Sequence, residues 1–411
     1  MAQDDIAVID EPVEGFGFDD LFFSRTDDRG VILSGNAVFT RLSGYAREEL
    51  IGAPHKRIRH PDMPRAVFRM MWDDLKAGRS FAGYVKNRSK CGRYYWVLAL
   101  SLPVNGGYFS VRLKPGEEMV NRIAKLYAEI RRAENRDGQP PEVGVAALEQ
   151  FARDAGFPDY HEFATEALFR EGALRAGKLG HSADPLDHNF AEVRRLMQEM
   201  DTTMTAIAGL LRRTRGSPTN LSIQGKRLQT GTETLKVIAQ NYSVLSEQIE
   251  RSVADMQAAM RDMHSAARSG RRGHCAFRLL SEAIPRYVAE PMEGDATARA
   301  QEVAFLTTAL AQFEASIGAG YGRVGAGVSA FTSVSANLKR VVSGLAMTRV
   351  MCRMEAARIH SNVGGIDEIN LQLGNFQDLL ATALDQITGT CSALSGNMIQ
   401  ISNRDARKRV A

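Results

Sequence analysis

The feature that most constrains the fold is a helical periodicity that fills the second half of the chain. From about residue 187 onward, apolar residues recur mostly at intervals of three and four, the spacing of one buried helix face. Two runs are clearest: Leu228, Leu235, Ile238, Tyr242, Leu245, Ile249, Val253, Met256, Met260 and Met263, and then Ile366, Ile369, Leu373, Phe376, Leu380, Ala383, Ile387, Leu394 and Met398. This spacing predicts long helices packed as a bundle, with the methionines as core residues rather than a metal site.

Segments that contain glycine divide this region into four or more helices. We expect the breaks near Gly216–Pro218, Gly270–Gly273, Pro291–Gly294 and Gly364–Gly365. The bundle is therefore predicted to occupy residues 187–402.

The N-terminal quarter has a different pattern, in which short strand and helix signals alternate with turns. The expected elements are a strand at Val31–Leu33, a short helix at Phe39–Gly44, a short turn at Glu48–Gly52, a longer helix through Phe68, Met71, Trp72 and Leu75, and strands at Phe81–Asn87, Tyr94–Leu102 and Gly107–Leu113. Ser89–Gly92 is a hairpin signal. This mixture predicts an α+β domain over residues 20–115, an antiparallel sheet with flanking helices, after an N-terminal tail at 1–19.

One loop of this domain concentrates charged side chains between two prolines. In the sequence Arg-Ile-Arg-His-Pro-Asp-Met-Pro-Arg, residues 57–65, Pro61 and Pro64 favour extended or turn geometry over helix. A constrained loop of this kind can hold a ligand. A simpler reading of the same residues makes Asp62 the N-cap of the following helix, because Asp-x-Pro before an amphipathic run is ordinary capping chemistry.

Several short motifs support the ligand-binding interpretation when they are taken in order. They are Asn36-Ala-Val-Phe39, Ser43-Gly-Tyr45, Gly52-Ala-Pro-His55, Arg59-His-Pro-Asp-Met-Pro64, Met71-Trp72, Gly83-Tyr-Val-Lys-Asn87-Arg88 and Tyr95-Trp96-Val97. With these motifs, residues 20–115 resemble the PAS domain of bacterial aerotaxis receptors. In that family the domain binds FAD without a covalent bond and reports the redox state of the cell.

The resemblance implies a flavin pocket formed by residues at the matching positions: Asn36, Arg59, His60, Asp62, Trp72 and Asn87. An isoalloxazine ring needs apolar walls and an amide-like partner at its edge, and Asn87 can both donate and accept. Arg59 and His60 could face the ribose or pyrophosphate, while Asp62 could instead brace Arg59. Trp72 could be a wall of the pocket or an ordinary core residue. No catalytic residue and no metal ligand is expected.

Other cofactors fit the sequence less well. No Gly-x-Gly-x-x-Gly motif follows a strand in this chain, which argues against Rossmann-type dinucleotide binding. Haem would need an axial histidine, usually on a helix that faces the pocket. The two histidines of the domain, His55 and His60, both lie in loop segments next to proline, so haem is the weaker alternative.

Composition and charge exclude several other classes of protein. A net charge of +4 over 411 residues is too small to argue for nucleic-acid binding. The four cysteines are far apart in sequence, which predicts neither a disulfide framework nor a zinc site. The N-terminus is acidic, unlike a signal peptide, and no stretch approaches the about 20 apolar residues of a membrane span. We therefore expect a cytoplasmic protein, closing with a basic tail at 403–411.

Between the two regions, residues 116–186 are predicted to be a helical adaptor and linker. Met119–Arg132 is its clearest helix, and Ala164–Arg175 continues the helical pattern. Asp137–Pro141 and Gly156–Pro158 interrupt it. No chemistry can be assigned to this segment from its sequence.

Two places in the helical region faintly resemble the hairpin tip of methyl-accepting chemotaxis proteins. Thr219–Leu228 is similar in outline to one side of that tip, and Met354-Glu-Ala-Ala-Arg358 repeats a Glu-Ala-Ala-Arg element. In that family the tip binds the chemotaxis coupling protein and histidine kinase. The resemblance implies these partners for the chain, together with a homodimer formed through the helical region.

Two hypotheses of different classes follow. The first is a non-enzymatic aerotaxis or redox sensor, with FAD in the PAS pocket and a helical bundle that passes the signal to the chemotaxis machinery. The second is a PAS-containing scaffold whose pocket is empty or holds another ligand, and whose helices mediate oligomerisation or docking. Motifs of histidine kinases, diguanylate cyclases and helix-turn-helix proteins are not found in the sequence.

Overall fold

The computed structural model describes residues 7–182, 184–214, 219, 220, 223, 232–291, 296–358 and 364–408. The chain divides into two compact units. The first comprises residues 1–184 and 268–317, and the second comprises residues 185–267 and 318–411. Each unit is described separately below.

The first unit is built on a five-stranded antiparallel sheet with the order β2-β1-β5-β4-β3. Its strands are β1 (Leu21–Thr26), β2 (Ile32–Gly35), β3 (Phe81–Arg88), β4 (Tyr94–Val104) and β5 (Gly107–Leu113). The central pair places Ser24 opposite Ser110 and Arg25 opposite Phe109. This register decides which side chains of β1 and β5 share a face of the sheet, because successive residues of a strand point to opposite faces.

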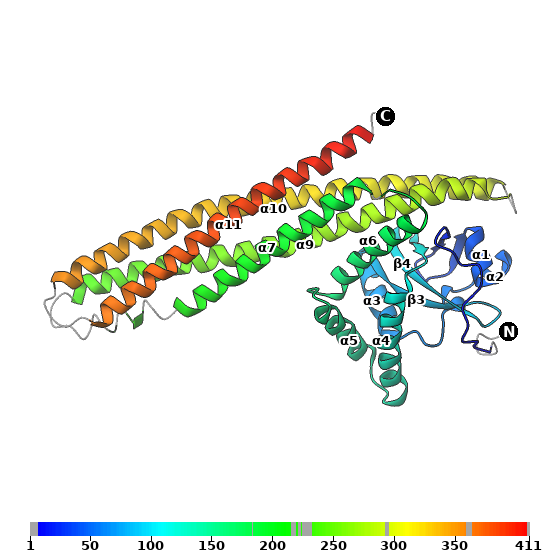
Figure 1. The fold of residues 1–411 in the computed structure, drawn as a ribbon, viewed down its shortest axis with the longest axis horizontal. Helices are drawn as coiled ribbons and strands as arrows, with labels where there is room; N and C mark the ends of the chain where they lie inside the picture. The colour runs from blue at the N-terminus through cyan, green and yellow to red at the C-terminus, as the bar shows by residue number, and fades with distance from the viewer. Residues whose placement is uncertain are drawn as a thin grey trace. The chain divides into compact units, whose positions relative to one another are not determined.

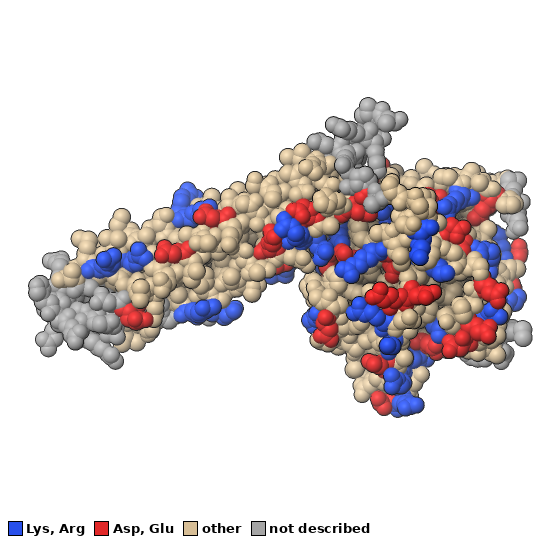
Figure 2. Space-filling model, viewed as in Figure 1, with Lys and Arg blue, Asp and Glu red and all other residues tan. Residues whose placement is uncertain are grey.

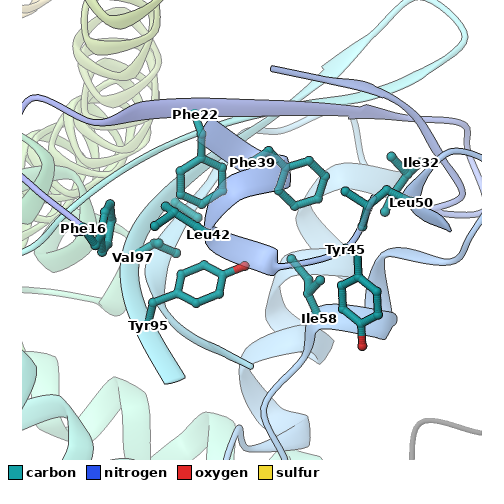
Figure 3. Packing of buried hydrophobic residues seen from close by; sticks show 11 residues of the cluster. Phe16, Phe22, Ile32, Phe39, Leu42, Tyr45, Leu50, Ile58, Tyr95 and Val97 are labelled. Atoms are coloured by element: carbon teal, nitrogen blue, oxygen red, sulfur yellow. The ribbon is translucent and has the colours of Figure 1, made fainter. Parts of the chain in front are cut away.

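Short helices cover one side of this sheet and close an aromatic core. They are α1 (Ala37–Ser43), α2 (Arg47–Leu50), the 3-10 turn η2 (His55–Ile58) and α3 (Arg65–Lys76). Figure 3 shows Phe22 and Phe39 among the apolar side chains of this core, and their rings stack with centroids 5.9 Å apart. Burying such side chains contributes about 1.5–3 kcal/mol each, which anchors β1 against α1.

The expected α+β class is confirmed, with one element missing from the prediction. The strands predicted at Val31–Leu33, Phe81–Asn87, Tyr94–Leu102 and Gly107–Leu113 correspond to β2 to β5. Strand β1 was not predicted, although it pairs with both β2 and β5.

The adaptor segment forms three helices that belong to the first unit. They are α4 (Glu117–Arg136), α5 (Pro141–Asp154) and α6 (Tyr160–Lys178). From α4, the buried Glu134 accepts hydrogen bonds from the backbone N–H groups of Arg65 (2.9 Å) and Ala66 (3.0 Å), at the start of α3. A carboxylate at this position satisfies the free N–H groups of a helix N-terminus. The adaptor therefore fixes α3.

The simpler interpretation of Asp62 as an N-cap is wrong. Pro64 occupies the N-cap position of α3 and provides no side-chain hydrogen bond. The N–H groups that Asp62 would have served are bonded to Glu134, which is distant in sequence. The carboxylate of Glu134, a residue of another helix, therefore caps α3 in place of a residue from the preceding loop.

Replacing Glu134 with alanine should therefore destabilise the first unit. We expect the free energy of unfolding to fall by about 2–3 kcal/mol, because two buried backbone N–H groups lose their acceptor. Chemical denaturation followed by circular dichroism measures this change. Glu129→Ala is the matched control, since Glu129 lies exposed on the same helix. Equal stability of the two variants would contradict this role of Glu134.

The first unit also includes parts of two long helices. These are α9 (Thr232–Ala289) and α10 (Ala296–Arg358), which contribute residues 268–289 and 296–317. The predicted boundary near residue 187 thus does not separate the units completely. The predicted break at Gly270–Gly273 is wrong, because α9 is continuous there. Gly273 instead allows close helix packing, since a Cβ at this position would lie 2.3 Å from Ser316 Oγ of α10.

The second unit is a four-helix bundle formed by one chain. Helices α7 (Pro185–Thr214) and α11 (Gly364–Lys408) run beside the remaining parts of α9 and α10 (Figure 1). Asn189 of α7 bonds Gln400 of α11 at 2.8 Å, and Phe190 of α7 stacks on Tyr321 of α10. The predicted bundle is confirmed, and Met256, Met260 and Met263 are buried in it as expected. A single chain thus supplies all four helices.

Several other expectations concern the ends of these helices and the molecular surface. The predicted break at 216–218, most of 219–228, and residues 292–294 lie outside the described residues. Helix α11 begins at Gly364, as predicted.

None of the described helices is both long enough and apolar enough to cross a membrane. Figure 2 shows acidic and basic side chains interspersed over the visible face, which does not favour a nucleic-acid interface.

Candidate functional site

A cavity of about 280 Å³ lies in the first unit, lined by the sheet, the loop before α3 and α3 itself. Its lining comprises Ser24, Thr26, Arg29, Gly30, Pro54, His55, Lys56, Arg59, Phe68, Met71, Trp72, Leu75, Val85, Asn87, Ala99, Ser101, Tyr108, Ser110 and Arg112. The volume is close to the lower limit of about 300–1,000 Å³ that is typical of small-molecule sites. It suits one flat ring system rather than a whole dinucleotide.

Apolar and aromatic side chains form much of the cavity wall. Trp72 of α3 meets Tyr108 of β5 edge to face, with ring centroids 5.5 Å apart. Trp72 also covers Gly30, where a Cβ would lie 3.1 Å from the indole and where φ is +80°. A glycine is needed there for both reasons. Aromatic walls of this kind bind the faces of a planar ligand.

A buried cation that has no acidic partner within the described part of the chain faces the same cavity. Arg112 of β5 is 6% exposed, and it donates to Ser24 Oγ and to His55 Nε2, both at 2.9 Å. Its guanidinium lies 5.4 Å from the centre of the Phe22 ring. Among the described residues, none of those that line the cavity carries a carboxylate. An unbalanced buried charge is costly and favours a ligand that brings negative charge.

The pKa values of this pair follow from their burial. Burial lowers the pKa of Arg112 to about 10, so that it stays charged at neutral pH. Burial, and then the charge of Arg112, lower the pKa of His55 to about 3. His55 is therefore neutral and can accept the hydrogen bond from Arg112 at Nε2. Arg112 therefore contributes a fixed positive charge to the cavity over the physiological pH range.

Asn87 offers the cavity an amide with an unused donor. The residue is 2% exposed, and its Nδ2 has no hydrogen-bond partner among the residues that the structure describes. Buried amide donors are rarely left without a partner, and a ligand can supply one. The loop that precedes α3 reaches this point because Arg59 forms an isolated antiparallel bridge with Asn87. The structure therefore brings Arg59 and Asn87 together.

Arg59 lies against Phe68 at the cavity wall. Its guanidinium is 3.7 Å from the centre of the Phe68 ring, and it donates to the carbonyl of Met63 at 3.3 Å. Burial, and then the charge of Arg131, lower the pKa of Arg59 to about 10, and it remains charged. Of the six predicted site residues, three line the cavity: Arg59, Trp72 and Asn87.

His60 and Asp62 do not line this cavity. Asp62 instead forms an ion pair with Lys86 of β3, in which Oδ2 lies 2.7 Å from Nζ. His60 is buried, with 1% of its surface exposed. Burial raises the pKa of Asp62, but the hydrogen bond and charge of Lys86 outweigh this and lower it overall. Burial, and then the charge of Lys86, lower the pKa of His60 to about 4. These residues hold the loop against β3.

Acidification should weaken the fold through His60. The pKa of His60 is about 4 in the folded state, against 6.5 for an ordinary histidine in the unfolded state. As the pH falls from 6.5 toward 4, the unfolded chain therefore binds a proton that the folded protein does not bind. Proton binding then favours the unfolded state, so the free energy of unfolding decreases over this range. Between pH 7 and 5, we expect a loss of about 2 kcal/mol from this residue. The His60→Asn variant should show a correspondingly flatter dependence of unfolding free energy on pH. His181→Asn, at an exposed position, is the control; an unchanged slope for His60→Asn would contradict the assignment.

Asn36 is used by the backbone of β1. Its Oδ1 accepts from the N–H of Phe23 at 3.2 Å, and its Nδ2 donates to the carbonyl of Leu21 at 2.9 Å. Both ends of the amide are therefore engaged, and the side chain does not line the cavity. Asn36 orders the strand that carries Ser24.

Sequence reasoning did not identify the charged centre of the cavity. Arg112 and Ser24 belong to strands β5 and β1, and the sequence suggests His55 as part of a motif and as a possible haem ligand, not as a partner of Arg112. The sequence offers one indication of Arg112: it is a basic residue in a predicted strand, Gly107–Leu113, in which polar and apolar residues alternate. Its partners could not be known without the register of β1 against β5.

Comparisons with known proteins agree with this architecture over the N-terminal part of the chain. Residues 32–109 match the family model described as a PAS fold. Over 114 residues the chain is 41% identical to the Aerotaxis receptor of Escherichia coli, covering 26% of this chain and 22% of the receptor. Over 82 residues it is 33% identical to the Biofilm dispersion protein BdlA of Pseudomonas aeruginosa, covering 20% of each protein.

The solved structures include the PAS domain of a protein from Colwellia psychrerythraea. It is 19% identical, with a TM-score of 0.20, and the match covers 23% of this chain and 85% of that domain. The chain spans about a fifth of the length of the curated relatives it matches. Together with the five-stranded antiparallel sheet and its flanking helices, the family match establishes that the N-terminal region of this chain is a PAS domain.

Proposed function

We propose that this protein is a redox sensor that binds FAD in its PAS domain, with the isoalloxazine ring in the cavity. The observation that carries the proposal is the buried Nδ2 of Asn87, which has no hydrogen-bond partner among the described residues and belongs to a residue that lines a cavity with aromatic walls. The edge of a flavin ring presents both hydrogen-bond donors and acceptors, which an amide can match. The relationship to the Aerotaxis receptor of E. coli supports the same assignment.

The residues present fit a flavin in three respects. Trp72, Tyr108 and Phe68 provide walls for a planar ring, and Asn87 provides the amide. The remainder of FAD exceeds the cavity and would lie outside it, where Arg29, Lys56 and Arg59 could attract its phosphates. Arg59 is the one of these three that the sequence also suggested.

When bound, a flavin supplies reversible electron transfer, which changes the charge in the pocket. Arg112 would then stabilise added negative charge, because it is a buried cation with neutral partners. His55 is neutral and accepts from Arg112, so a change at Arg112 would also alter the hydrogen bonds of His55 and Ser24. The pocket is therefore suited to convert a change of ligand charge into a change of hydrogen bonding.

Titration of the purified, flavin-free protein with FAD, FMN and riboflavin tests the binding step. Quenching of flavin fluorescence should saturate at one equivalent for ligands that contain the ring. Tighter binding of FAD than of riboflavin would support phosphate contacts at the mouth of the cavity. If none of the three quenches at micromolar protein concentration, the proposal fails.

The helical region is proposed to pass the signal to the chemotaxis coupling protein and histidine kinase from the cytoplasm, without catalysis by this chain. Both curated relatives are named for sensing or dispersal behaviour rather than for an enzyme activity. The suggested tip residues Arg227 and Leu228 lie outside the described residues. Co-purification with the coupling protein, lost on substitution of Arg227 and Leu228 together, tests this output. A homodimer is proposed as well, although one chain completes the four-helix bundle.

The alternative of a scaffold with another cofactor or none has less support. Haem would need a free axial histidine, but His55 Nε2 already accepts from Arg112, and His60 lies away from the cavity. An empty pocket would leave the Asn87 donor and the Arg112 charge without compensation. Both observations favour an occupied site that prefers a negatively charged or electron-accepting ligand.

A further inference from the structure

Strands β1 and β5 separate the cavity from the α9–α10 hairpin, the name used here for residues 268–289 of α9 and 296–317 of α10. Five residues of these strands line the cavity: Ser24, Thr26, Tyr108, Ser110 and Arg112. The residues that alternate with them along each strand point to the opposite face, as strand geometry requires. Of these, Phe23, Arg25 and Phe109 contact the hairpin, so one layer of backbone connects the cavity to a segment more than 150 residues away in sequence.

A buried carboxylate fastens the hairpin to the sheet. Glu302 of α10 is 5% exposed and lies 2.7 Å from the guanidinium of Arg25 in β1. The same carboxylate accepts from Ser34 Oγ of β2. Arg25 also lies 4.7 Å from the centre of the Phe305 ring, one turn further along α10. The Arg25 side chain is 25% exposed, but the Glu302 carboxylate is buried and has little water to replace its partner. A shift of β1 that breaks this contact would therefore be costly for Glu302.

Aromatic contacts accompany this ion pair on the same face. The ring centroids of Phe23 and Tyr287 of α9 are 5.3 Å apart, and those of Phe109 and Phe313 of α10 are 6.5 Å apart. Phe23 and Phe109 also contact each other at 5.6 Å. The hairpin is therefore packed on β1 and β5 by both its helices, and its seating depends on the positions of these two strands.

On the cavity side, the neighbour of Arg25 is bound to the buried cation. Ser24 Oγ accepts from Arg112 at 2.9 Å and lies 3.2 Å from His55 Nε2. A negative charge that arrives in the cavity competes with Ser24 for the Arg112 guanidinium. Loss of this hydrogen bond would leave Ser24, the residue next to Arg25, held by the pairing of β1 with β2 and β5 but no longer bound to Arg112.

We propose that the α9–α10 hairpin responds to the charge of the ligand in the cavity. Ser24, Arg25 and Glu302 form the relay between the cavity and the hairpin. Added negative charge in the cavity loosens Ser24 from Arg112, weakens the contact of Arg25 with Glu302, and loosens the hairpin on the sheet. The same helices continue in the chain into the second unit, which gives the change a route to the bundle. This inference rests on the proposed binding of a redox-active ligand.

The fastening role of Glu302 is tested without any ligand. In Glu302→Ala, we expect backbone hydrogen exchange in residues 296–317 and in β1 to become on the order of 10- to 100-fold faster, because a buried ion pair is broken. Gln301→Ala, at the exposed neighbouring position, should leave exchange unchanged. The charge exchange Arg25→Glu with Glu302→Arg should restore protection relative to either single variant. Equal exchange in Glu302→Ala and Gln301→Ala would overturn the fastening role.

The relay is tested by comparing oxidised and chemically reduced flavin in the full-length protein. Reduction should raise hydrogen exchange in residues 268–289 and 296–317 of the natural sequence, and this difference should disappear in Glu302→Ala. Bound flavin whose reduction leaves the hairpin unchanged would overturn the relay alone. A protein that binds no flavin would overturn the proposed function and the relay with it, and its absorbance spectrum would reveal that case.

Discussion

Replacing Asn87 with leucine should lower the affinity for flavin by roughly 10- to 100-fold, because the ligand would lose its amide partner. Leucine has nearly the shape of asparagine but has no polar atoms. Since Nδ2 of Asn87 is buried and none of the described residues accepts a hydrogen bond from it, the same substitution should not reduce the stability of the protein without flavin. We expect its melting temperature to stay constant or to rise.

This combination of effects distinguishes a binding residue from a structural one. Asn105→Ala, at an exposed position in the β4–β5 turn, serves as the control for both titration and thermal unfolding. A fall in affinity accompanied by an equal fall in ligand-free stability would indicate that Asn87 supports the fold instead. Unchanged affinity would remove Asn87 from the site.

The second large effect is expected on replacing Arg112 with methionine. This change removes the buried positive charge of the cavity while it keeps an unbranched side chain. The midpoint potential of a bound flavin should become more negative by on the order of 100 mV, for one charge about 5 Å away at an effective dielectric constant of about 20. The reason is that electron uptake adds negative charge, which Arg112 stabilises when present.

Spectroelectrochemical titration of the loaded protein measures this shift. Arg29→Met is a suitable control, because Arg29 also lines the cavity but has a side chain that is 80% exposed. Solvent screens an exposed charge, so its removal should change the potential much less. If both variants shift the potential equally, the special role assigned to Arg112 is wrong.

Strand β1 shows why part of the fold could not be predicted from the sequence. Strand β1 contains Phe22 and Phe23 side by side, followed by Ser24 and Arg25, which is not a simple alternation of polar and apolar residues. Both faces of β1 are covered, one by the aromatic core and the other by the α9–α10 hairpin. A strand buried on two faces loses the period of two on which prediction depends.

The site was predictable where local sequence carried it. The Arg59 loop and Asn87 were identified, and an isolated backbone bridge joins them in the structure. Asn36 was placed in the pocket by the resemblance, whereas its amide is engaged by Phe23 and Leu21. The pairing of Arg112 with Ser24 and His55 depends on contacts between three separate segments, which no motif records.

The helical half of the chain shows the same division between local and long-range information. Periodicity identified the bundle, but the glycines at 270–273 suggested a break that does not occur. Arg271 pairs there with Glu166 of α6 at 2.7 Å, and Arg272 donates to Thr165 of α6 at 2.8 Å. Tertiary contacts thus hold α9 straight through a stretch of weak helix propensity.

The absorbance spectrum of the purified protein, followed by identification of the cofactor released on denaturation, tests the central claim most directly. Our account predicts a yellow protein whose flavin absorbance bleaches on reduction and which releases FAD. A colourless protein that retains no flavin after incubation with excess FAD would contradict it, as would a haem spectrum.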